Sequence, residues 1–139
     1  MLHTFAISAS GMTAERLRMD TIANNLANAN TTRTAGGGPY RRQVPVFAAR
    51  ETRVPGRPGG FTGAGVRVIG IHHDSSPPRL VYDPNHPDAD ANGYVAMPNV
   101  DVVREMVDLI TASRAYEANV TAFNTAKNMA MRALDIGRA

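Results

Sequence analysis

The sequence predicts a mainly α fold in which a long helix at each end flanks a small β-rich middle region with long Gly/Pro loops. Two observations lead to this prediction. Apolar residues recur at heptad spacing near both ends of the 139-residue chain, and the stretch between them alternates short extended runs with glycine and proline. We therefore expect an N-terminal helix over residues 1–30, a loop and β region over 31–98, and a C-terminal helix over 99–139.

The N-terminal segment places its apolar residues on one helical face. Four of them follow one another at intervals of seven residues: Phe5, Met12, Met19 and Leu26. This is the spacing of a coiled-coil seam. Gly11 lies inside the pattern, where glycine costs about 1 kcal/mol relative to alanine. A close approach of another helix at Ser10 and Gly11 is the expected reason for that cost.

The middle region predicts short strands separated by loops. We expect an edge strand over residues 43–48, a stronger strand over 65–72 that pairs with 79–82 across the Ser75–Pro78 turn, and a short extended piece over 93–96. Residues 31–39 and 53–65 are loops by composition. So few strand residues cannot bury an enzyme-sized core.

The C-terminal segment runs from Asn99 to Gly137 without an internal proline or glycine. Its predicted heptad seam consists of Val102, Met106, Leu109, Tyr116, Val120, Phe123, Ala130 and Leu134. Pro98 and Asn99 mark the expected start of the helix. A helix of this length spans about 57 Å, so we expect it to pack on something outside a compact globule.

The excess of positive over negative charge is confined to the first part of the chain. Lysine and arginine exceed aspartate and glutamate by five in residues 1–58, whereas residues 59–98 carry −2 and residues 99–139 are neutral. The arginines that gather after the first helix are Arg41, Arg42, Arg50, Arg53 and Arg57. They suit nucleic-acid phosphates or acidic residues of a neighbouring subunit. Few aromatic residues accompany them, which favours the protein partner.

Other patterns give no positive sign of catalysis, a cofactor or a metal. His72 and Asp74 can converge on one strand face, and residues 88–93 copy the first positions of an EF-hand loop. No helix signal precedes that loop, and Asn99 stands where a bidentate glutamate is needed, so an Asx-type turn is the favoured interpretation. The sequence also lacks an uninterrupted signal-peptide core and a stretch long enough to span a membrane.

Several motifs resemble those of the axial proteins of the bacterial flagellum, which comprise rod, hook and hook-associated proteins. At the N-terminus they are Ser10-Gly11-Met12 and Ile22-Ala23-Asn24-Asn25-Leu26-Ala27-Asn28. The later motifs, Tyr82-Asp83-Pro84-Asn85-His86-Pro87-Asp88 and Ala115-Tyr116-Glu117-Ala118-Asn119-Val120, are similar to those of proximal rod proteins. The resemblance is collinear and covers nearly the whole chain.

The resemblance implies a structural rod subunit whose two ends pair as an antiparallel coiled coil. Such subunits pack in a helical array around an export channel in the periplasm, and they leave the cell through the flagellar type III export apparatus without a cleaved signal. The implied partners are copies of the chain, other rod proteins and the rod-base adaptor. On this interpretation Asn24, Asn25, Asn28, Arg41, Arg42 and Arg50 face adjacent subunits, and both helices fold on assembly. A nucleic-acid-binding or adaptor coiled coil is the alternative, and a calcium-binding module is a third.

Overall fold

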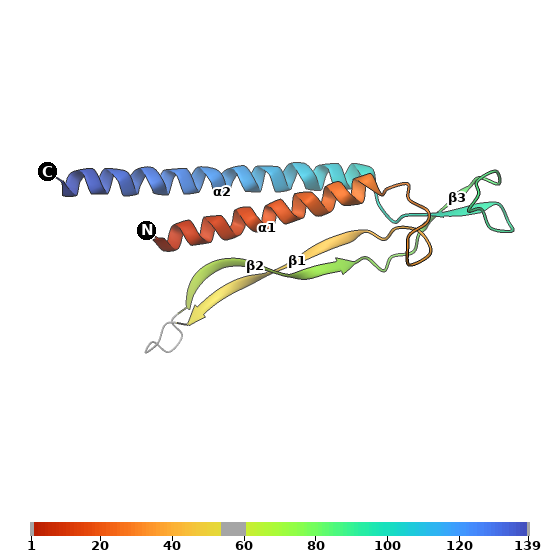
Figure 1. Ribbon diagram of the computed structural model, residues 1–139, viewed down its shortest axis with the longest axis horizontal. Helices are drawn as coiled ribbons and strands as arrows, with labels where there is room; N and C mark the ends of the chain where they lie inside the picture. Colours follow the sequence, from red (N-terminus) through yellow and green to blue (C-terminus); the bar gives the residue numbers. More distant parts are fainter. Residues whose placement is uncertain (1, 54–60, 139) are drawn as a thin grey trace.

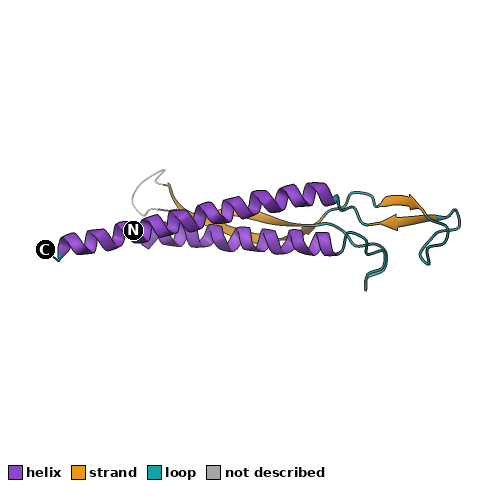
Figure 2. Cartoon of the chain, turned by 90° about the horizontal axis from the view of Figure 1, so that it is seen from above, coloured by secondary structure: helices purple, strands orange, loops and turns teal. Residues whose placement is uncertain are grey.

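The computed structural model describes residues 2–53 and 61–138. Its elements are α1 (Leu2–Ala27), β1 (Gln43–Arg53), β2 (Phe61–His73), β3 (Arg79–Tyr82), β4 (Tyr94–Met97) and α2 (Val102–Gly137). The two helices lie side by side in opposite directions, and β1 and β2 form a twisted ribbon beside α1 (Figure 1). The β3–β4 hairpin projects past the helices at the end opposite the C-terminus (Figure 2). The chain is thus mainly helical and elongated.

The α2 helix begins at Val102, three residues later than the expected start at Asn99. Asp101 is the N-cap, and its carboxylate accepts from the backbone N–H groups of Val103 and Arg104. This satisfies two of the donors that the first turn of a helix leaves free. The Asn99 side chain is used instead to join the backbone at Arg42 to that at Asp74.

The helices meet along a seam that begins on α2 at Glu105. Phe5 and Phe123 stack edge to face with ring centroids 5.0 Å apart. A Cβ atom on Gly11 would lie 2.7 Å from the Asn119 side-chain oxygen. The expectation of a close helix approach at Gly11 is therefore confirmed. Because residues late in α1 face residues early in α2, the helices run antiparallel.

The position of this seam corrects part of the heptad prediction. On α2 it follows Glu105, Ala112 and Asn119, one residue before the predicted series that contains Met106 and Val120. Met106, Val102 and Leu134 belong to the predicted series but are 54%, 46% and 68% exposed. The pattern misled because polar and small residues fill the narrow seam, and large apolar residues occupy the outer side.

The rest of the predicted packing set is half-buried. This holds for Met12, Met19 and Leu26 on α1 and for Leu109, Tyr116 and Val120 on α2. Side chains of this kind have one side against the chain and one side free. Their packing inside the subunit remains an expectation from the heptad spacing.

The strands pair differently from the prediction. β1 pairs with β2 from Gln43 opposite His73 to Arg53 opposite Phe61, whereas β3 pairs with β4. The expected pairing of residues 79–82 with 65–72 is wrong, because β3 pairs with β4 and lies in a separate two-stranded sheet. Strand structure also extends into both ends of the expected 53–65 loop. Residues 54–60, including Arg57, lie outside the described residues.

One of the contacts between the ribbon and α1 is very close. Gly65 has a φ of +102°, and a Cβ atom there would lie 2.1 Å from the Ser10 hydroxyl oxygen. That hydroxyl accepts from the Val66 N–H at 3.1 Å and donates to the Ile7 carbonyl at 2.7 Å. Glycine is required at residue 65 for both its backbone conformation and the space.

Candidate assembly surfaces

A buried group of polar side chains joins the two helices where they approach the β elements. We call Asn25, Tyr40, Arg42, Glu105 and Asp108 the polar cluster. Asn25 and Glu105 are both 0% exposed. The Asn25 amide donates to Glu105 at 3.0 Å and to the Gln43 carbonyl at 2.8 Å. Its oxygen accepts from the Tyr40 hydroxyl and the Gln43 N–H, each at 2.9 Å.

Arg42 completes this cluster by neutralising the buried acid. Its Nε donates to Glu105, its Nη2 lies 3.4 Å from an Asp108 oxygen, and its side chain is 17% exposed. Burial raises the pKa of the Tyr40 hydroxyl, and the negative charge of Glu105 raises it further. Arg42 neutralises Glu105, and the Asn25 amide has hydrogen-bond partners on both its nitrogen and its oxygen. The cluster therefore fixes α1, α2 and the start of β1 to one another.

Two predicted interface residues therefore face inward. Asn25 and Arg42 are predicted to contact adjacent subunits, but in the structure both side chains bond to Glu105 within the polar cluster. The reason is that a buried glutamate at position 105 needs a cation and a donor close by. Sequence reasoning missed Glu105, because position 105 lies outside the predicted heptad series of Val102, Met106 and Leu109.

The other predicted interface residues remain accessible to a partner. Asn24 donates to the Tyr40 hydroxyl at 3.2 Å but its side chain is exposed, and Asn28 is half-buried. Arg41 and Arg50 are exposed. Arg50 lines a groove of about 530 Å³ between α1 and β2, whose walls include Ala6, Ala9 and Val66.

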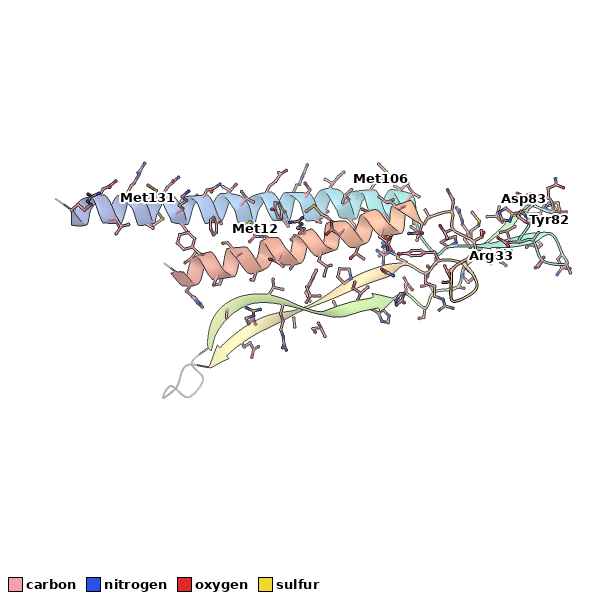
Figure 3. The ribbon with its side chains drawn as sticks, viewed as in Figure 1. Met12, Arg33, Tyr82, Asp83, Met106 and Met131 are labelled. Carbon is pink, nitrogen blue, oxygen red and sulfur yellow. The ribbon has the colours of Figure 1, made fainter. Side chains whose placement is uncertain are left out.

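The outer side of the first half of α2 is unusually apolar. Its exposed members are Val102, Val103, Met106, Val107 and Ile110. We call these five residues the outer apolar row. Residues three and four apart adjoin on a helix, so they form one continuous surface. Figure 3 shows Met106 on the side of α2 that faces away from α1. The heptad spacing predicts two members of this row, Val102 and Met106, to lie in the seam.

The loop that resembles an EF-hand is held by hydrogen bonds between its own side chains and backbone. One carboxylate oxygen of Asp90 accepts from the N–H groups of Asn92 and Tyr94, each at 2.9 Å. This is the Asx-type turn that the sequence favoured. Asp88 instead accepts from Thr32 at 2.8 Å and pairs with Arg33, and these hydrogen bonds hold the pKa of its carboxyl below the ordinary value. Both acids are thus engaged in fixing the loop.

Among residues 2–53 and 61–138, neither helix contains an apolar stretch that would cross a bilayer. Within the same residues, the acidic and histidine side chains form no group of three that could hold a metal ion.

Comparison with known proteins identifies the class. A family model described as flagella basal body rod protein matches residues 5–33, and one described as flagellar basal body rod FlgEFG protein C-terminal matches residues 91–136. Both ends of the chain, which form α1 and most of α2, are therefore those of a flagellar rod protein.

Curated relatives narrow this class. The flagellar basal-body rod protein FlgC of Borreliella burgdorferi is 50% identical, with 94% of this chain and 93% of the relative covered. The FlgC proteins of Bacillus subtilis and Salmonella typhimurium are 45% and 44% identical. These two alignments cover 98% and 99% of this chain and 97% and 98% of the relatives. The chain belongs to the FlgC family of flagellar basal-body rod proteins, and its role is that of a structural rod subunit.

Proposed function

We propose that this chain packs in a helical array with copies of itself and other rod proteins to form the wall of the hollow proximal rod. The observation that carries the proposal is the outer apolar row on α2, five large apolar side chains that the described chain leaves uncovered. Exposed apolar surfaces of this kind mark protein contacts. A repeated contact between two different surfaces of a subunit extends into a filament.

The finer parts of the proposal follow from the family resemblance. α1 and α2 pair as an antiparallel coiled coil, and the chain divides into an N-terminal rod helix over 1–30, a loop and small β region over 31–98 and a C-terminal coiled-coil helix over 99–139. The rod lies in the periplasm, and the chain reaches it through the flagellar type III export apparatus without a cleaved signal. The rod-base adaptor is a further partner. Asn24, Asn28, Arg41 and Arg50 contribute polar contacts between subunits.

The test places a charge in the outer apolar row and follows assembly. Val107→Asp in the full chain should leave the fold of the isolated chain unchanged, because Val107 is exposed, and should prevent incorporation into purified basal bodies. Val107→Leu keeps the surface apolar and serves as the matched control, so it should incorporate normally. Normal incorporation and motility of the aspartate variant would contradict a buried role for this row.

A further inference from the structure

The two ends of the elongated molecule differ in chemistry. One end is the last part of α2, residues 127–138, which we call the α2 tail. The other is the turn of the β3–β4 hairpin, residues 82–94, which we call the hairpin tip. Figure 3 shows Met131 of the α2 tail and Tyr82 and Asp83 of the hairpin tip at opposite extremes of the long axis.

The α2 tail extends past the N-terminus of α1. Because Phe5 faces Phe123 and the helices are antiparallel, the last ten or so residues of α2 have no α1 beside them, a length of about 15 Å. The exposed apolar side chains there are Met129, Met131, Leu134 and Ile136. Met129 and Ile136 are two turns apart on one face, and Met131 and Leu134 are one turn apart on another. A helix that is apolar on more than one face belongs in a buried setting.

The two ends also carry opposite charges. The α2 tail has three basic residues, Lys127, Arg132 and Arg138, and one acidic residue, Asp135. The hairpin tip has three aspartates and no lysine or arginine. Among the residues that the structure describes, Asp88 forms an ion pair with Arg33. With Arg33 counted, the net charge is therefore +2 at one end and −2 at the other.

The hairpin tip offers an exposed aromatic surface. The Tyr82 and Tyr94 rings pack edge to face at 5.3 Å, yet they are 64% and 43% exposed. Methionine sulfur and arginine both make favourable contacts with tyrosine rings. The α2 tail supplies both kinds of side chain, so the ends match in apolar character as well as in charge.

We propose that the α2 tail of one copy of this chain docks on the hairpin tip of a second copy, head to tail along the long axis. This inference deepens the proposed function and rests on it, since it names one of the contacts between copies in the rod. A contact between opposite ends does not close on itself, so it propagates as a line of subunits.

Charge reversal on the full chain tests the pairing. Arg132→Glu and Asp83→Lys should each weaken self-association about fivefold to tenfold in sedimentation at low salt, because an attractive exposed pair becomes repulsive. Both changes in one chain should restore association to near that of the unchanged protein. Arg114→Glu, an exposed reversal in the middle of α2, is the matched control and should have little effect.

A disulfide trap gives a second readout, which is clean because the chain contains no cysteine. Met131→Cys with Asn85→Cys in one chain should yield oxidised oligomers, since the two positions are too far apart to join within one molecule. Met131→Cys with Glu117→Cys, an exposed position on α2 outside the outer apolar row, is the control and should stay monomeric.

In sedimentation, the docking is overturned by an unchanged protein that stays monomeric at every concentration, by no rescue in the double reversal, or by equal weakening in the control. If Arg132→Glu chains still enter basal bodies normally, only this contact is wrong. If the unchanged chain itself fails to enter them, the proposed function fails.

Discussion

The two halves of the helix pair are held together by different chemistry. In the joined half, residues 18–27 of α1 and 102–112 of α2, directional hydrogen bonds and a buried ion pair connect the helices to β1. In the terminal half, residues 2–11 and 119–137, the contacts between the helices include the Phe5–Phe123 pair and the Gly11–Asn119 approach, and Ser10 and His3 add hydrogen bonds to β2 but no buried ion pair. Local stability follows buried contact density, so we infer that the joined half folds alone and the terminal half depends on neighbours.

The largest expected effect is in the joined half. Glu105→Ala leaves Arg42 largely buried without its main partner, and breaking a buried ion pair in this way costs about 3–5 kcal/mol. Denaturant unfolding of the full chain should show this loss. Glu117→Ala, an exposed change on the same helix, is the control and should alter stability by less than about 0.5 kcal/mol. Equal effects of the two changes would mean that the polar cluster does not hold the helices.

Phe123→Ala probes the terminal half. In the assembled rod the loss of this ring should cost about 3–4 kcal/mol, because neighbours then enclose it. In the isolated chain the same change should have little effect on the denaturation midpoint. Thermal dissociation of rods and unfolding of the free chain supply the two measurements. A large loss in the free chain would remove the difference between the halves.

Asp101→Ala sharpens the comparison at the start of α2. Loss of the cap leaves two first-turn N–H groups without their acceptor and should cost about 1 kcal/mol. Asp101→Asn retains an acceptor and should recover most of that loss. The change should appear as faster amide exchange in residues 102–106 while residues 119–137 are unaffected. A uniform change along α2 would show that the halves are coupled.

The smallest effect concerns the loop that is tied by Asp88. Its pKa is lowered in the folded chain by the Thr32 hydrogen bond and then by Arg33. A lowered pKa means that its contribution is present above the unfolded-state value and is lost as pH falls below about 4. NMR shifts of Thr32 and Arg33 should follow this titration. Asp88→Asn should abolish the pH dependence, and its persistence would assign the transition to another group.

The sequence predicted the element types well because each signal was local. The heptad spacing, the glycine at residue 11 and the Asx turn at Asp90 all depend on residues near one another in the chain. The pairing of β3 with β4 is not evident from the sequence because a long connection, residues 83–93, separates the two strands. On α2 the heptad pattern predicts Met106 in the seam, whereas the structure has the preceding residue, Glu105, there and leaves Met106 exposed.

The candidate surfaces were less predictable for the same reason. Asn25 and Arg42 have the composition of interface residues, and only the fold brings Glu105 between them. From the sequence alone, the outer apolar row resembles a buried core. The reason is that residues that pack in the chain's own core and residues that contact a partner are both apolar. The family comparisons do not distinguish these uses of a residue.

The most direct test is amide hydrogen exchange of the full chain, measured alone and then in purified basal bodies. Alone, residues 18–27 and 102–112 should exchange slowly and residues 2–11 and 119–137 quickly. In basal bodies both halves should be strongly protected. If the terminal half is as protected in the free chain as in the rod, the helix pair is self-sufficient and the division between the halves is wrong.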